Sequence, residues 1–270
     1  MLPVAQRLIA EGHELIAVFS FPCDQMFNYN LGCKTLAQKH EALYIESPIE
    51  TTHIHSLYQK QVEIFISCGY PYKIPPINEE RAYGINIHPS VLPEARGIMP
   101  VPFIIIEQLK SAAGYSIHKL SEKFDRGDVL FQQKIHLTPD DSVETYTAKI
   151  IISAPQAVCN LLSDMKAQWR NTAPQDEDYA SFYPAPDDEM RTLYWDDTVS
   201  NILRRANAFG RYGCLAKAGN HRLQIFACDG WEQPHQYKPG AVVTLQNNIA
   251  IIAAMNGFII IKEFTRVNLQ

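Results

Sequence analysis

The sequence lacks the cysteine patterns of a disulfide-rich or zinc-binding protein. Its six cysteines are scattered over 270 residues, no two form a Cys-x-x-Cys pair, and no histidine stands at zinc-ligand spacing from a cysteine pair. Disulfides persist mainly in oxidising compartments, where small secreted domains depend on them. We therefore expect reduced thiols, a cytoplasmic protein and no metal.

The sequence is also poor in positive charge and in long apolar runs. The 24 Lys and Arg residues against 29 Asp and Glu give a net charge of −5, so non-specific binding to a polyanion is not expected. No apolar run approaches the roughly 20 residues that span a bilayer, and no signal-peptide pattern opens the chain. These absences favour a globular protein with no membrane partner.

Three regions follow one another along the chain. Apolar strands alternate with amphipathic helices over residues 1–166, which predicts an α/β domain with a doubly wound, mostly parallel sheet. Residues 167–190 are rich in proline and acidic residues, which predicts a solvated linker. Over residues 191–270 a helix is followed by short strands and turns, which predicts a small antiparallel β-barrel.

One strand end carries the side chains of a candidate catalytic site. The apolar run from Tyr83 to Ile87 predicts a buried strand that ends at Pro89. Asn86 and His88 are two residues apart, so extended backbone directs both side chains to one face. Ligands of open α/β sheets bind at the carboxyl ends of strands, an amide can donate to an oxyanion, and an imidazole can move a proton. A single Asn or His at a strand end is more often structural, so the pair alone leaves both readings open.

The residues that follow carry a resemblance to a known family. From Asn86 to Gly97 the order is Asn-x-His-x-Ser-x-Leu-Pro-x-x-x-Gly, and Asp125 in Asp-x-Gly follows His88 by 37 positions (125 − 88). The segment Gly114–His118 is similar to a Gly-x-Thr-x-His strand, with Ser in place of Thr. The sequence therefore resembles the folate-dependent formyltransferases, which include methionyl-tRNA, glycinamide ribonucleotide and sugar N-formyltransferases.

The resemblance implies an activity, a fold and a set of site residues. The activity is transfer of a formyl group from 10-formyltetrahydrofolate to a primary amine, without a metal. The fold is a Rossmann-like domain (1–166) followed by an OB-like barrel (191–270). Asn86 would stabilise the oxyanion, His88 would move the proton, and Asp125 would orient the imidazolium. Folate would lie against two loops that contain Gly69, Tyr70, Pro71, Tyr72, Ser90, Leu92, Pro93 and Gly97. Arg96 and His118 also fall on family positions near the site. Arg96 is expected either to contact substrate or to face solvent, and His118 either to contact substrate or to pack in the interior.

Two departures from the family pattern bear on the acceptor and on the start of the chain. The family begins with a central strand, whereas this sequence begins with a predicted helix from Leu2 to Gly12. The alternatives are a misplaced start, a fragment of a longer chain and a rebuilt sheet. We favour the misplaced start and expect an upstream in-frame segment that encodes a short apolar strand. The loop Cys23–Asn30 lacks the Lys and Arg residues of the long basic loop in tRNA-modifying members.

The lack of basic residues in this loop favours a small or carrier-bound amine, such as a nucleotide-linked amino sugar, as the acceptor. Methionyl-tRNA remains the alternative, because the predicted two-domain layout also resembles methionyl-tRNA formyltransferase. Two further alternatives are a non-catalytic folate-binding module and an enzyme that hydrolyses formyl-folate to formate, with water as the acceptor.

Overall fold

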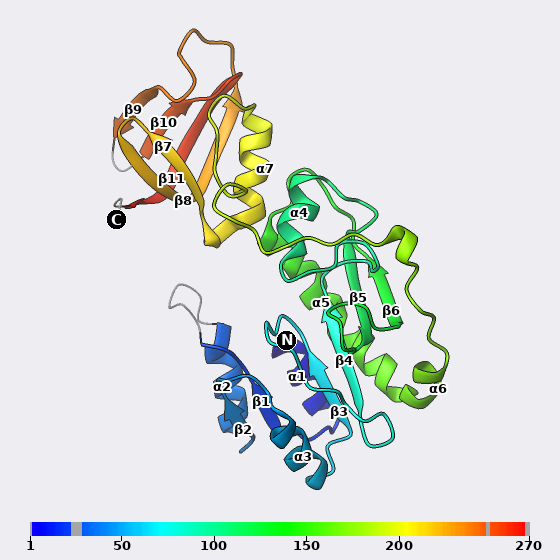
Figure 1. Cartoon of the computed structure of the whole chain (residues 1–270). Coiled ribbons are helices and arrows are strands. Elements are labelled where there is room, and N and C mark those ends of the chain that lie inside the picture. Colours follow the sequence, from blue (N-terminus) through cyan, green and yellow to red (C-terminus); the bar gives the residue numbers. More distant parts are fainter. Residues whose placement is uncertain (1, 23–28, 247–248, 268–270) are drawn as a thin grey trace. The chain divides into compact units, whose positions relative to one another are not determined.

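The computed structural model describes residues 2–22, 29–246 and 249–267 (Figure 1). The chain divides into two compact units. Unit 1 comprises Met1–Ile98, Ser111–Ile135 and Ala148–Tyr183, and unit 2 comprises Met99–Lys110, His136–Thr147 and Pro184–Gln270. Residues 167–183 of the predicted linker therefore belong to unit 1. Among the described residues, no helix is long and apolar enough to cross a membrane.

Unit 1 begins with alternating helices and strands. The helices are α1 (Leu2–Ala10), α2 (Tyr29–Lys39) and α3 (Thr51–Gln59), and the strands are β1 (Ala17–Phe19), β2 (Leu43–Ile45) and β3 (Ile64–Ser67). Strands β1 and β2 pair in parallel as a separate two-stranded sheet. A helix that connects two strands has the length that a parallel crossover needs, so the α/β class follows from the order of elements and is confirmed.

The four-stranded sheet of unit 1 has the order β3-β4-β5-β6 (Figure 1). Its other strands are β4 (Tyr83–His88), β5 (Gly114–Lys119) and β6 (Val129–Lys134). Strand β4 is parallel to β3, but β5 is antiparallel to both β4 and β6. The prediction of a mostly parallel sheet is therefore wrong for this half. The connection 120–128 between β5 and β6 is too short for a parallel crossover, which needs about a dozen residues.

Two buried strands form the centre of unit 1. Most side chains of β4 and β5 are buried, including those of Ile85, Ile87, Tyr115 and Ile117. Helix α5 (Val143–Ser163) is followed by α6 (Met165–Arg170), whose Trp169 is also buried. Burial of such side chains is worth about 1.5–3 kcal/mol each, so the strands that carry the candidate site are firmly anchored.

Unit 2 contains a five-stranded antiparallel sheet in the region where the sequence predicts a small antiparallel β-barrel. Its helices are α4 (Pro100–Ile106) and α7 (Val199–Phe209). Its strands pair antiparallel in the order β7-β8-β11-β10-β9. Their bounds are Cys214–Ala218 for β7, His221–Glu232 for β8, Val242–Gln246 for β9, Ile249–Ala253 for β10 and Gly257–Val267 for β11.

Candidate active site

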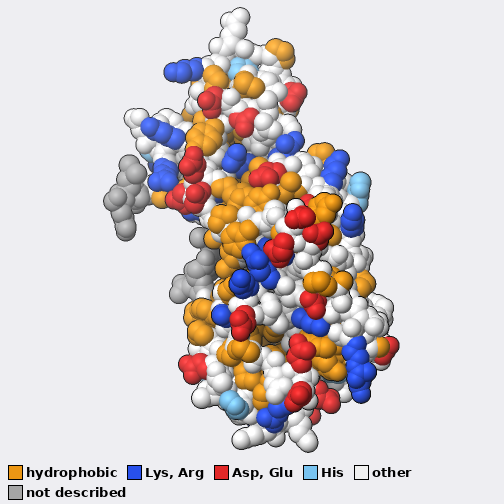
Figure 2. Space-filling model, turned by 45° about the vertical axis from the view of Figure 1, so that its right-hand side comes forward, with side chains coloured by type: hydrophobic (Ala, Val, Ile, Leu, Met, Phe, Trp, Pro, Cys, Tyr) orange, Lys and Arg blue, Asp and Glu red, His pale blue; other side chains and the backbone are white. Residues whose placement is uncertain are grey.

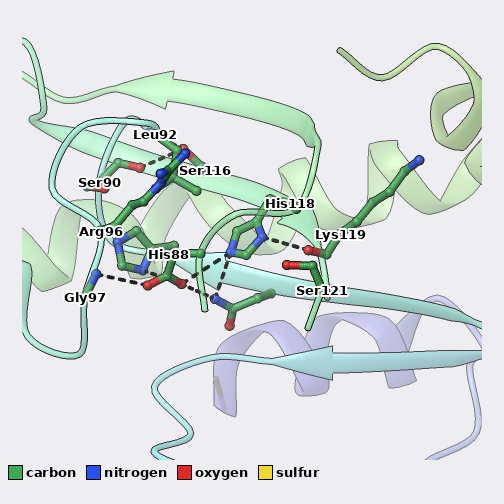
Figure 3. A network of polar contacts seen from close by, with 12 residues as sticks. His88, Ser90, Leu92, Arg96, Gly97, Ser116, His118, Lys119 and Ser121 are labelled. Atoms are coloured by element: carbon green, nitrogen blue, oxygen red, sulfur yellow. Dashed lines mark hydrogen bonds and ion pairs between the residues drawn. The ribbon is translucent and has the colours of Figure 1, made fainter. Parts of the chain in front are cut away.

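Strand β4 and the loop between β5 and β6 bring the three predicted catalytic residues together. Figure 3 shows the polar network around His88 and His118. The Nδ1 atom of His88 lies 3.3 Å from Oδ1 of Asp125, and the Nδ2 atom of Asn86 donates to the same oxygen at 3.4 Å. His88 and Asp125 are 4% and 7% exposed, whereas Asn86 is only partly buried. The amide of Asn86 is therefore the member of the cluster with the best access to a ligand.

The Asp125 carboxylate is oriented from the loop that follows β4. The backbone N–H of Gly97 donates to Oδ2 of Asp125 at 3.0 Å. Asp125 itself has a φ of 56°, a left-handed conformation that costs a non-glycine residue about 1 kcal/mol or more. Two residues on, a Cβ at Gly127 would collide with the carbonyl oxygen of Lys119. The loop 120–128 therefore runs tightly along β5, and this course places the carboxylate over His88.

The contacts of His88 determine which ring nitrogen can accept a proton. Its Nε2 atom lies 2.9 Å from the carbonyl oxygen of Ala95, so Nε2 carries a hydrogen and donates it. The neutral ring then has its lone pair on Nδ1, facing Asp125. Burial lowers the pKa of His88, and the Asp125 carboxylate only partly offsets that effect. At neutral pH His88 is therefore an uncharged base beside an anion.

Asp125 remains ionised in this environment. Burial alone would raise the pKa of Asp125, but the imidazoles of His118 and His88 and the Gly97 N–H outweigh it, and the pKa is lower than usual. A carboxylate that stays charged beside His88 favours the protonated form of the ring when His88 accepts a proton.

His118 supports Asn86 from the neighbouring strand. Residue 118 on β5 stands opposite residue 86 on β4. Its Nδ1–H donates to the carbonyl oxygen of Lys119 at 2.8 Å, which leaves Nε2 to accept from Nδ2 of Asn86 at 3.0 Å. The Nε2 atom also lies 3.6 Å from the Asp125 carboxylate. The buried ring thus orients the amide plane of Asn86.

The predicted folate-binding residues lie on two loops that leave adjacent parallel strands. In the loop after β4, the hydroxyl of Ser90 donates to the carbonyl oxygen of Glu94 at 2.7 Å and so stabilises the loop. In the loop after β3, the hydroxyl of Tyr70 accepts from the N–H of Ile49 and donates to the carbonyl oxygen of Ser47. The first loop contains Ser90, Leu92, Pro93 and Gly97, and the second contains Gly69, Tyr70, Pro71 and Tyr72.

Arg96 lies inside the protein rather than on its surface. It is 2% exposed, and its guanidinium donates to the side chains of Gln175 and Glu177. Sequence reasoning missed these two partners because they stand about eighty positions away in a proline-rich and acidic segment. The available signal was a charge pair: an arginine within the family motif and a carboxylate in the acidic run.

Comparison with known proteins identifies two matching family models. The model described as formyl transferase matches residues 29–162, and the model described as formyl transferase, C-terminal domain, matches residues 187–268. Together they cover most of the chain. Among the described residues, no group of three or more His, Cys, Asp or Glu side chains has the arrangement of a metal site.

Individual relatives and solved structures agree with these models. Methionyl-tRNA formyltransferase of Bacillus subtilis is 24% identical over 265 residues, which cover 94% of this chain and 83% of that protein. HypX from Aquifex aeolicus, solved in complex with tetrahydrofolic acid, matches with a TM-score of 0.74 and 20% identity over 95% of this chain. This match spans 45% of HypX, less than half of its length.

A third match covers nearly the full length of both proteins. The N-formyltransferase from Helicobacter canadensis, solved with folinic acid and dTDP-3-aminofucose, matches with a TM-score of 0.66 and 14% identity, covering 98% of this chain and 95% of that chain. The two family models, the relatives and the fold agree on one assignment. The chain belongs to the folate-dependent formyltransferases, enzymes that use a formyl-tetrahydrofolate as the one-carbon donor.

Proposed function

We propose that Asn86, His88 and Asp125 catalyse transfer of a formyl group from 10-formyltetrahydrofolate to a primary amine. The observation that carries this proposal is the convergence of an amide, a neutral imidazole and an ionised carboxylate within 3.4 Å contacts at the end of β4. Acyl transfer to an amine develops negative charge on the formyl oxygen and requires a proton to leave the amine, and these three groups supply both needs.

Each residue has a distinct task. The Asn86 amide donates to the developing oxyanion after its 3.4 Å contact with Asp125 opens, a contribution of about 3–4 kcal/mol in comparable acyl-transfer sites. The Nδ1 atom of His88 accepts the amine proton, while Nε2–H keeps donating to the carbonyl oxygen of Ala95. When the C–N10 bond of the tetrahedral adduct breaks, this proton passes to N10 and tetrahydrofolate leaves. Asp125 stabilises the resulting imidazolium through its existing contact with Nδ1. Since both ring nitrogens contact protein atoms, the Nδ1–Asp125 contact has to open briefly to admit the proton.

The donor binds, on this proposal, along the two loops beside the cluster. The loop after β4 includes the buried Leu92 and the crowded Gly97, which together give a rigid wall. The loop after β3 presents the partly exposed rings of Tyr70 and Tyr72, which contact each other edge to face at 5.5 Å. An apolar and aromatic lining of this kind suits a flat heterocycle such as a pterin.

A small or carrier-bound amine is the proposed acceptor, for example a nucleotide-linked amino sugar. On the face drawn in Figure 2, acidic and basic side chains are interspersed rather than gathered into a basic area, and the net charge is −5. A tRNA acceptor needs a basic surface for the phosphates. Methionyl-tRNA stays the alternative, because relatives with that name match over 94% of this chain. The loop that bears on this choice, residues 23–28, lies outside the described residues.

The test compares the wild type with Asn86→Ala, His88→Ala and Asp125→Ala in steady-state kinetics. The donor is 10-formyltetrahydrofolate, and the acceptors are a dTDP-linked amino sugar and methionyl-tRNA. We expect each substitution to lower kcat at least about a hundredfold. Binding of 5-formyltetrahydrofolate should remain nearly unchanged in all three variants.

Other outcomes point to the alternatives. Full activity of His88→Ala would remove the mechanism. Binding of the folate without transfer to any amine would indicate a binding module, and release of formate without an amine would indicate a hydrolase. The faster acceptor, measured as kcat/KM, decides between an amino sugar and tRNA.

A further inference from the structure

We infer that Arg96, Gln175 and Glu177 are positioning residues of the active site. They belong to an assembly in which residues 173–183, here called the brace, fix the two loops that orient His88 and Asp125. This inference rests on the proposed function, because it assigns these residues to the same reaction. It differs from the sequence-based prediction, in which residues 167–190 form a solvated connection.

Arg96 anchors the brace to the loop after β4. Its Nη1 and Nη2 atoms donate to the two carboxylate oxygens of Glu177 at 3.0 and 2.9 Å, and Nε and Nη2 donate to Oε1 of Gln175 at 3.1 and 2.7 Å. The exposed Arg126 also contacts Glu177 at 3.1 Å. A buried guanidinium needs such partners, since an unpaired buried charge is strongly unfavourable. Any displacement of the brace therefore disturbs the loop that carries Arg96.

Gln175 connects the same arginine to the loop that carries the catalytic carboxylate. Its Nε2 atom donates to the backbone carbonyl oxygens of Asp125 at 2.8 Å and of Gly127 at 2.7 Å. One side chain thus accepts from Arg96 and donates to Asp125. Both hydrogens and both acceptor lone pairs of this amide are in use, so its position is closely determined.

The backbone of the brace adds a second set of contacts on either side of Arg96. The N–H of Arg96 donates to the carbonyl oxygen of Ser181, and the N–H of Tyr183 donates to the carbonyl oxygen of Arg96. The hydroxyl of Ser181 accepts from the N–H of Ala95 at 2.8 Å. A short parallel bridge forms between residues 96 and 182.

These contacts bear directly on the catalytic pair. The residues on either side of Arg96 are Ala95, whose carbonyl oxygen accepts from His88, and Gly97, whose N–H donates to Asp125. The brace therefore fixes both the ring of His88 and the carboxylate of Asp125, one through each neighbour of Arg96. Misplacement of a catalytic group by about 1 Å can lower a rate a hundredfold, so the brace is expected to act on kcat.

The test uses Gln175→Glu, which keeps the contact of residue 175 with Arg96 and removes its contacts with the loop 120–128. The new carboxylate still accepts from Arg96, but it has no hydrogen for the carbonyl oxygens of Asp125 and Gly127. We expect kcat to fall roughly ten- to a hundredfold while the KM for 10-formyltetrahydrofolate changes little. The matched control is Gln156→Glu on α5, an exposed glutamine that contacts Asn160, and it should leave both constants unchanged.

A second readout does not depend on the acceptor. In protein labelled with ¹⁵N-histidine, NMR reports the tautomer and the pKa of His88. Gln175→Glu should shift that pKa or redistribute the tautomers relative to wild type, and Gln156→Glu should not. Thermal unfolding of each variant shows how much of the protein is folded. Should Gln175→Glu fail to fold, Glu177→Gln, which keeps the shape of the side chain, is measured in its place.

Including His88→Ala in the same assays distinguishes a failure of this inference from a failure of the proposed function. If His88→Ala is inactive while folded Gln175→Glu has wild-type kcat and an unchanged His88 pKa, the brace has only a structural role and the inference is overturned. If His88→Ala is fully active, the proposed function fails instead, and the NMR measurement alone then decides whether the brace positions the ring.

Discussion

Two loops leave the four-stranded sheet at neighbouring strand ends, and they differ in how firmly they are fixed. The loop after β4 is mostly buried; its least exposed residues are Ser90 at 0%, Leu92 at 3%, Ala95 at 0% and Arg96 at 2%. The loop after β3, residues 68–75, is exposed or only partly buried throughout. On the proposed function, the first loop orients groups that take part in bond making, and the second presents rings to the folate donor. Rigidity is therefore concentrated where the chemistry needs it.

Glycine shows the same contrast at a single position in each loop. Gly97 has a φ of 120° and Gly69 has a φ of 65°, so both adopt a left-handed backbone. A Cβ at Gly97 would collide with the carbonyl oxygen of Tyr183, whereas nothing lies within 4 Å of a Cβ at Gly69. Gly97 is thus required both by its backbone and by the brace, and Gly69 only by its backbone.

The largest effect is expected from Gly97→Ala. The new methyl group has to displace the brace, and the shifted N–H can no longer orient the Asp125 carboxylate. We expect at least about a hundredfold loss of kcat together with a lower midpoint of thermal unfolding. Gly69→Ala is the matched control: it carries only the left-handed strain of about 1 kcal/mol, and its kcat should stay close to wild type. Equal losses in the two variants would contradict the contrast between the loops.

The second prediction concerns the pH dependence of kcat/KM, which is set by His88 and Asp125. On the proposed mechanism His88 acts as the neutral base, and burial lowers its pKa, so kcat/KM should decline only on the acid side of the usual histidine range. In Asp125→Asn the carboxylate that raises the pKa of His88 is gone, so the pKa falls further and the acid limb moves to lower pH. The rate at neutral pH should fall about a hundredfold or more, since the imidazolium loses its partner.

A pH series of kcat/KM for wild type and Asp125→Asn measures this shift. An acid limb that stays at the wild-type pH, or moves to higher pH, would show that the carboxylate does not raise the pKa of His88. His118→Gln serves as the comparison, because it removes a ring near Asp125 while the carboxylate beside His88 stays in place.

The sequence predicted which residues lie together in the proposed catalytic cluster, but not the structure that supports them. Alternation along a strand places Asn86 and His88 on one face, because extended backbone has a period of two. Asp125 was assigned through the resemblance, since nothing local shows that a loop folds back over β4. The direction of β5 was missed because a strand pattern is the same whether the strand runs parallel or antiparallel.

The brace was beyond sequence reasoning for a related physical reason. Its contacts join Arg96 to residues 79 and 81 positions away, and composition around Gln175 and Glu177 favours a solvated segment. The proline and acidic content of a segment predicts only how that segment behaves in isolation. They do not reveal that a buried arginine elsewhere needs a carboxylate, which only the folded chain shows.

A smaller effect is expected from Ser90→Ala in the loop after β4. The Ser90 hydroxyl donates to the carbonyl oxygen of Glu94, and its loss should reduce the free energy of unfolding by about 1 kcal/mol. The loop keeps its other contacts, so kcat should fall only a few-fold. Denaturant unfolding and steady-state kinetics measure both effects. A loss as large as that of His88→Ala would mean that Ser90 acts in the chemistry itself.

The smallest effect is expected from Tyr70→Phe in the exposed loop. The substitution removes the hydroxyl that accepts from the N–H of Ile49 and donates to the carbonyl oxygen of Ser47, but it keeps the ring. The unfolding free energy should fall by about 1 kcal/mol, with kcat unchanged and the affinity for 5-formyltetrahydrofolate reduced only slightly. Tyr72→Phe, which keeps the edge-to-face ring contact, is the control and should change neither quantity. A loss of kcat in Tyr70→Phe with normal folate binding would place this loop in the chemistry and remove the distinction between a fixed catalytic loop and an adaptable binding loop.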